Sequence, residues 1–180
     1  MSQEYKLFHK IKYTAYVAVS IDGRIAKNSQ SGTDWTSKED WNFFQKSLKK
    51  FDAVVVGHNT YNVSKHRLKK RHTIVLTSKA TKLKSFGSVI FFNPEKSNLK
   101  NFLKSKNYKK VAILGGSKVY DFCLRNKMLD ELFVTVEPYV FTTGIPMFSG
   151  DKFQKYRFIL QTVKKLNKGG TILLHYKNGN

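Results

Sequence analysis

Apolar runs rich in β-branched and aromatic residues recur along the chain at intervals that suit strands. Central runs such as AVVV at 53–56 and VAIL at 111–114 are almost continuously apolar, which is typical of strands covered on both faces. We therefore predict eight strands. They fall at 13–20, 51–57, 72–78, 88–92, 110–116, 131–138, 156–166 and 171–176.

Segments with helical periodicity lie between these strands. Segment 36–50 begins with Thr36 or Ser37 as a candidate cap, places acidic residues in its first turn, and repeats apolar residues every three or four positions. Two more helices are predicted at 97–107 and 117–128. The alternation predicts an α/β fold with a central, mostly parallel eight-stranded sheet, helices on both faces and an antiparallel C-terminal hairpin at one edge.

Polar groups follow three of the predicted strands where the chain leaves the sheet. They are GHNTY at 57–61, LTSK at 76–79 and GGSKVY at 115–120. Each offers backbone N–H groups, hydroxyls or a cation, the groups that bind anions, although each also suits ordinary capping. Because ligands of open α/β sheets bind at the carboxyl ends of the strands, the three together favour a phosphate-rich ligand.

Asp40 stands out as an acid among aromatic residues. It lies in the first turn of the first predicted helix, between Trp35 and Phe44 in sequence. The helix N-terminus favours its ionised form, and apolar neighbours oppose it. It is either an ordinary helix-start acid or an acid that holds a cationic or amidine-like ring and supports proton transfer.

Length and composition fit one globular domain over residues 1–180. Apolar residues make up 41% of the chain and aromatic residues 14%, which is enough to form a core. The net charge is +21, from 33 Lys and Arg against 12 Asp and Glu. Such a surface attracts anions, including nucleotides and nucleic acid. Only five of the cations are Arg, and they are dispersed, so a solvated lysine-rich surface is favoured over a nucleic-acid interface.

The remaining composition points to a cytoplasmic protein without a metal site. No apolar run approaches the length of a membrane span, and the first ten residues lack a secretory signal. The single cysteine, Cys123, follows Phe122 in a helical pattern, so we expect a small buried residue rather than a nucleophile. The sequence does not decide between a monomer and a homodimer.

From Tyr13 to Tyr176 the chain resembles dihydrofolate reductase and its wider superfamily, which includes the reductase domain of riboflavin biosynthesis. AVSIDGRIA at 18–26 resembles the first strand and the loop that covers the nucleotide. DWTSKEDWNFF at 34–44 is similar to the segment whose acid binds the pterin. GHNTY and LTSK resemble the segments that hold the cofactor phosphates. The resemblance implies a dihydrofolate-reductase-like fold, NADPH as cofactor and a small-molecule substrate.

The resemblance also assigns roles to residues that act on the substrate. Asp40 corresponds to the acid that binds the pterin, Thr135 to the threonine that supports it, and Arg71 to the arginine that binds the folate glutamate. Trp35, from the same segment 34–44 as Asp40, completes the predicted catalytic group. The predicted substrate-binding residues are Ala18, Ile25, Phe44, Arg71, Leu114 and Tyr120.

The cofactor site implied by the resemblance spans all three strand ends. There the family also holds the peptide bond corresponding to Gly115–Gly116 in the cis form, and a Cβ at this strand end would collide with the cofactor or strain the backbone. The predicted NADPH-binding residues are Ala18, Ile25, Gly57, His58, Asn59, Thr60, Leu76, Thr77, Ser78, Lys79, Leu114, Gly115, Gly116, Ser117, Lys118, Val119 and Tyr120.

Two substrates stay open within this resemblance. Reduction of 7,8-dihydrofolate is the first hypothesis, since Arg71 and Thr135 match groups that folate enzymes carry. The segments SIDGRIA, LDEL and VEPYVFTTGIPMF are closer to the riboflavin-type reductases, which reduce a ribosylamino-pyrimidine. His58 stands where the family usually has an arginine at the 2′-phosphate, so the preference for NADPH over NADH also stays open. A basic nucleic-acid-binding module is a third, less favoured reading.

Overall fold

All eight predicted strands are present in the computed structural model, which describes residues 10–81 and 83–179. They belong to one nine-stranded sheet in the order β10-β11-β8-β1-β7-β3-β4-β6-β5. Its strands are β1 (Lys12–Val19), β3 (Ala53–Gly57), β4 (Thr73–Leu76), β5 (Lys84–Phe86), β6 (Val89–Phe92), β7 (Lys110–Ile113), β8 (Glu131–Val136), β10 (Phe158–Lys165) and β11 (Ile172–Asn178).

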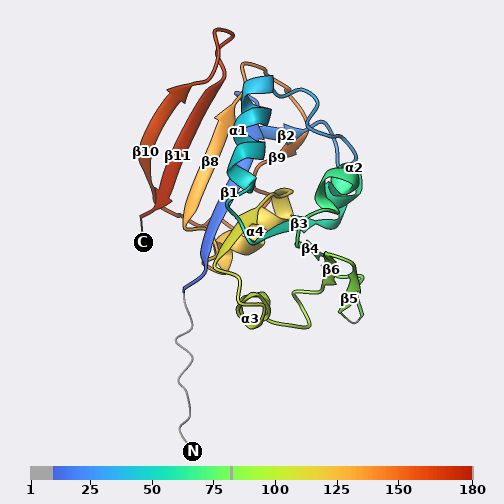
Figure 1. Ribbon diagram of the computed structural model, residues 1–180. Coiled ribbons are helices and arrows are strands. Elements are labelled where there is room, and N and C mark those ends of the chain that lie inside the picture. Colours follow the sequence, from blue (N-terminus) through green and yellow to red (C-terminus); the bar gives the residue numbers. More distant parts are fainter. Residues whose placement is uncertain (1–9, 82, 180) are drawn as a thin grey trace, which may run out of the picture.

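The centre of the sheet is parallel and both edges are antiparallel. Strands β8, β1, β7, β3, β4 and β6 pair in parallel, while β11 runs antiparallel to β8 and forms a hairpin with β10. Strand β5 closes the opposite edge antiparallel to β6. The predicted α/β fold with a C-terminal hairpin is therefore confirmed, and Figure 1 shows the hairpin as the outer edge beside β8.

Helices cover both faces of the sheet because side chains alternate along the buried strands. Val54 and Val56 of β3 pack with α1 (Lys38–Leu48) and α2 (His58–Leu68), whereas Ala53 and Val55 pack with α3 (Leu99–Ser105) and α4 (Ser117–Arg125). Cys123 of α4 is fully buried, and burial raises the pKa of its thiol, as expected for a packing residue.

Four elements were not predicted. The sheet gains the short strand β5, and a separate two-stranded ribbon pairs β2 (Arg24–Ala26) with β9 (Ile145–Pro146). Helix α2 begins directly after Gly57, where the sequence indicated only a polar turn. The predicted absence of a secretory signal falls on residues 1–9, which lie outside the described chain.

Candidate active site

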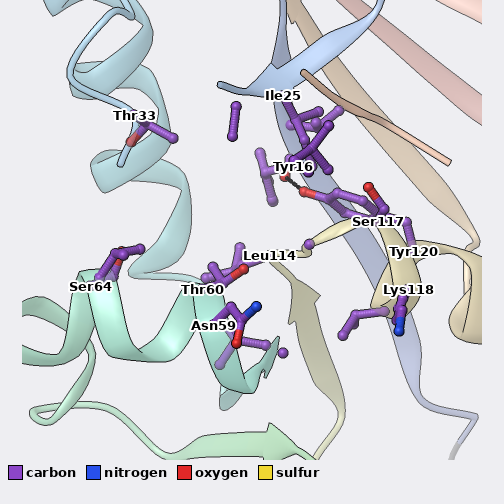
Figure 2. A pocket seen from close by; sticks show the side chains of 18 of the residues that line it. Tyr16, Ile25, Thr33, Asn59, Thr60, Ser64, Leu114, Ser117, Lys118 and Tyr120 are labelled. Carbon is purple, nitrogen blue, oxygen red and sulfur yellow. Dashed lines mark hydrogen bonds between the residues drawn. The ribbon is translucent and has the colours of Figure 1, made fainter. Parts of the chain in front are cut away.

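A cleft of about 970 Å³ opens at the carboxyl ends of the central strands. The three polar segments meet there, through residues 57–60 at the end of β3, 76–79 at the end of β4, and Leu114 with 116–120 after β7. Ala18 of β1 and Thr135 of β8 complete this edge of the cleft. Figure 2 shows Asn59, Thr60 and Ser64 of α2 on one side of the pocket and Ser117 and Lys118 of α4 on the other.

Two helices present uncapped N-termini to this cleft. The N-caps of α2 and α4 are Gly57 and Gly116, neither helix has a side-chain cap, and neither has an acid in its first turn. By contrast, the N-caps Ser37 of α1 and Asn98 of α3 each accept a backbone N–H bond. Free N–H groups at two positive helix ends suit an anionic ligand such as a pyrophosphate.

Tight packing explains the glycines at this edge. Gly115 has φ +84°, and a Cβ on it would lie 2.7 Å from the ring of Tyr120. Tyr120 is buried, and its hydroxyl donates to the Tyr16 carbonyl oxygen at 2.6 Å, the bond drawn in Figure 2. The Gly115–Gly116 peptide bond is cis, as the resemblance implied. A Cβ on Gly115 would therefore collide with the Tyr120 side chain of the protein, whether or not a cofactor is bound.

Asp40 and Thr135, which the resemblance paired, both line the cleft and are joined by a side-chain hydrogen bond. Ser37, confirmed as the N-cap of α1, accepts a hydrogen bond from the Asp40 N–H at 3.2 Å. Burial raises the pKa of the Asp40 carboxyl, a hydrogen bond from Thr135 lowers it, the charge of Glu137 raises it, and Thr36 lowers it again. The net pKa is above the usual value, which suits a group that shares protons with a ligand.

Aromatic side chains form a wall beside this carboxyl. Tyr16 stacks on Phe133 with ring centroids 5.0 Å apart, and Phe43 and Phe44 of α1 lie about 6 Å from Tyr16. All four line the cleft. A flat heterocycle fits against such a wall, with its polar edge toward Asp40.

Two guanidinium groups lie in the cleft away from the β8 side. Arg71, half-buried, donates through Nη1 to the carbonyl oxygen of Leu48 at 3.2 Å, which fixes it beside the C-terminal end of α1. Arg67 of α2 lies 4.4 Å from the centre of the Trp41 ring. Both cations line the cleft and suit an anionic substituent of a substrate.

Nearly every predicted site residue lines this cleft. The exceptions are Trp35 and Gly115. Trp35 packs edge-on against Phe141, with ring centroids 4.8 Å apart. Gly115 is buried, and its neighbour Gly116 lines the cleft.

Several lining residues were missed from the sequence. Arg67 and Ser64 belong to α2, which was not recognised as a helix. Trp41 was assigned to the buried stripe of the first predicted helix, and Phe43 was noted only as an aromatic neighbour of Asp40. Phe133 precedes Thr135 by two positions on β8, so strand alternation was the signal that places both on one face.

The sequence profile described as dihydrofolate reductase matches residues 13–172. The chain belongs to the dihydrofolate reductase family. Uncharacterized protein YwjB of Bacillus subtilis (strain 168) is 27% identical to it over 173 residues, covering 92% of this chain and 97% of that protein.

Solved structures share the fold of this dihydrofolate reductase family member. A pyrimidine reductase-like protein from Corynebacterium diphtheriae superposes with a TM-score of 0.76 at 18% identity, covering 94% of this chain and 92% of that one. A dihydrofolate reductase from Enterococcus faecalis, complexed with NADP(H) and RAB-propyl, superposes with a TM-score of 0.68 at 23% identity, covering 97% of this chain and 100% of that one. Members with this fold are reductases of small molecules.

The described residues give no sign of two other kinds of site. Within 10–81 and 83–179, no helix has the length and apolar character needed to cross a membrane. Over the same ranges no group of three His, Cys, Asp or Glu residues is arranged to hold a metal ion.

Proposed function

We propose that this protein is an NADPH-dependent reductase that converts 7,8-dihydrofolate to tetrahydrofolate. The observation that carries the proposal is the order of charged and aromatic groups along the cleft. Asp40, supported by Thr135, provides a carboxyl in one part, an aromatic wall follows, and Arg71 provides a guanidinium beside Leu48. Dihydrofolate has the matching order of an amino-pyrimidine edge, aromatic rings and a glutamate carboxylate.

The residues at the strand ends provide hydrogen-bond donors and a cation that suit the phosphates of the cofactor. The uncapped N-termini after Gly57 and Gly116 would bind the pyrophosphate, and Thr77, Ser78 and Lys79 would bind the adenosine phosphate. Ala18, Ile25, Leu114 and Tyr120 form the apolar part of the lining and would hold the nicotinamide. When bound, NADPH supplies a hydride to the imine carbon of the substrate.

Asp40 would hold the amino-pyrimidine edge of the pterin by charge-assisted hydrogen bonds. The carboxyl, whose pKa is raised by burial, would also favour protonation of the imine nitrogen next to the carbon that is reduced. Thr135, which is buried, fixes the carboxyl by its hydrogen bond. The segment 26–34 and Ile25 would cover the nicotinamide and exclude water.

One observation favours a second substrate, the ribosylamino-pyrimidine of riboflavin biosynthesis. Arg67, held against Trp41, adds a cation at the cleft that suits a substrate phosphate as well as a carboxylate. The same Asp40 carboxyl would bind the amino-pyrimidine edge of this compound.

A substrate comparison tests the proposal. Purified protein is mixed with NADPH and either dihydrofolate or 5-amino-6-(5-phosphoribosylamino)uracil, and the loss of NADPH absorbance is followed against a blank without substrate. Turnover with dihydrofolate that falls by about 10²-fold or more in Asp40→Asn is the expected result. Turnover only with the ribosylamino-pyrimidine would replace the first substrate by the second, and NADPH binding without turnover of either would refute both.

A further inference from the structure

A deeply buried carboxylate, Glu137, lies near enough to Asp40 for its charge to act on the Asp40 carboxyl. Glu137 follows β8 directly, is 1% exposed and does not line the cleft. It is two positions after Thr135, the residue that supports Asp40. A carboxylate this deeply buried needs polar partners, and here they come from two distant segments.

Both oxygens of Glu137 accept hydrogen bonds. Oε1 accepts from the backbone N–H of Ser37 at 2.7 Å, and Oε2 accepts from the Thr171 hydroxyl at 2.7 Å. The Thr171 oxygen itself accepts from the Asn167 amide at 2.9 Å, so its single proton is directed to Glu137. Each carboxylate oxygen thus accepts one hydrogen bond and donates none, which is the arrangement expected of an ionised glutamate.

These bonds join the start of α1 to the loop of the β10–β11 hairpin. Ser37 is the N-cap of α1, and its side chain accepts the Asp40 N–H, so two successive bonds connect Glu137 to the Asp40 backbone. On the other side, Asn167 also donates to Glu39 at 3.1 Å. The negative charge of Glu137 lies at the positive end of α1, where the helix dipole stabilises it.

We propose that Glu137 is a positioning residue for Asp40, which holds the first turn of α1 against the hairpin loop and places a fixed negative charge behind the Asp40 carboxyl. The inference rests on the proposed function of Asp40 as the acid that binds the substrate. It adds a residue that touches neither substrate nor cofactor and acts only through its neighbours.

Charge and hydrogen bonding both act in this arrangement. After burial, the charge of Glu137 is the next cause that raises the pKa of Asp40, against hydrogen bonds from Thr135 and Thr36 that lower it. The neighbours of Asp40 on the same helix, Lys38 and Glu39, are exposed to solvent, which screens their charges. Ser37, Thr171 and Asn167, which surround Glu137, are uncharged.

The test compares Glu137→Gln with Glu39→Gln. Both variants remove one negative charge near the start of α1, and glutamine at 137 keeps an oxygen for the Ser37 N–H and an amide toward Thr171. Aspartate carboxyl carbons are labelled with ¹³C and titrated by NMR, with the Asp40 signal assigned by its loss in Asp40→Asn. We expect the Asp40 midpoint to move to lower pH in Glu137→Gln and to stay in place in Glu39→Gln. An unmoved midpoint in Glu137→Gln would overturn the proposal.

A second variant covers the case in which Glu137→Gln does not fold. Thr171→Val keeps the shape and the carboxylate but removes one of the two bonds that hold it. We expect a several-fold higher KM for dihydrofolate with unchanged NADPH affinity, whereas equal effects on both ligands would oppose a specific action on Asp40. The NMR titration uses no substrate, so a shift in a protein that does not reduce dihydrofolate refutes the proposed function and leaves the placement of Glu137 supported.

Discussion

Replacement of Arg71 by leucine provides the sharpest test of which substrate the cleft binds. The Arg71 guanidinium has five N–H donors, and the bond to the Leu48 carbonyl oxygen uses one on Nη1. The remaining donors can form a forked pair with a carboxylate. Hydrogen bonds to charged groups contribute about 1.5–3 kcal/mol each when buried. Because Arg71 is half-exposed, we expect a total near 2 kcal/mol, or about a 30-fold loss in kcat/KM.

The assay measures kcat/KM for two substrates in three proteins. Dihydrofolate is compared with a dihydropterin that lacks the glutamate tail, using wild type, Arg71→Leu and Lys70→Leu. Lys70 is exposed, lies next in sequence and does not line the cleft, so its replacement changes the net charge by the same amount without touching the site. The loss is expected only for Arg71→Leu with the substrate that carries the tail.

Two results would refute the reasoning. An equal loss with both substrates would mean that Arg71 acts on the structure of α1 through Leu48, and urea unfolding of the variant would then show a large loss of stability. Unchanged kinetics with dihydrofolate would mean that Arg71 does not bind the glutamate, and the folate assignment would lose its main support.

The remaining predictions concern the acid, one glycine and the cofactor. Asp40→Asn is expected to lower kcat with dihydrofolate by about 10²-fold or more, measured against an unchanged Kd for NADPH. Burial raises the pKa of Asp40 in the folded state, so its ionisation destabilises the fold as pH rises through that pKa. Thermal melts should therefore show Asp40→Asn above wild type at neutral pH and equal to it below the ordinary aspartate range, and equal melts throughout would contradict this sign. Gly115→Ala places a Cβ 2.7 Å from Tyr120 at φ +84°, so a loss of about 1–3 kcal/mol in urea unfolding is expected, against little change in Gly150→Ala, whose nearest contact is 3.9 Å away. NADPH at 100 times its Kd should stabilise the protein by about 2.7 kcal/mol, and a melt that does not respond would remove the cofactor from the proposal.

The centre of the sheet could be predicted because its strands β3, β4 and β7 are apolar and buried on both faces. In the AVVV run of β3, Val54 and Val56 face one helix layer and Val55 faces the other. Because both faces of the strand are buried, every position must be apolar, and this run can be recognised in the sequence alone. Helix α2 lacks this signal. Its apolar residues include Tyr61 and Leu68, its N-cap is glycine and its first turn carries no acid, so the helix depends on packing against β4 and β6.

The candidate site likewise contains residues that could be recognised in the sequence and residues whose surroundings could not. Asp40 could be singled out because it is an acid at a helix start among aromatic residues, and the resemblance then assigned its role. Glu137 gives no such signal, since its partners are set by the pairing of β8 with β11. That register places Ile172 opposite Val136, and this brings Thr171 beside Glu137. The position of Trp35 depends likewise on Phe141, from a loop more than 100 residues away in sequence.

The N-termini of the four helices differ in capping, and this difference bears on both stability and the proposed ligand binding. Helices α1 and α3 begin with side-chain caps at Ser37 and Asn98, whereas α2 and α4 begin with Gly57 and Gly116 and leave their first N–H groups without a side-chain partner. A glycine N-cap is only roughly a few tenths of a kcal/mol less favourable than a side-chain cap, so the two uncapped ends have a small cost to the free protein. Both uncapped ends open into the same cleft and neither carries an acid that would repel an anion. An anionic ligand that binds there would supply the missing caps, and the phosphates of the proposed cofactor have the charge to do so.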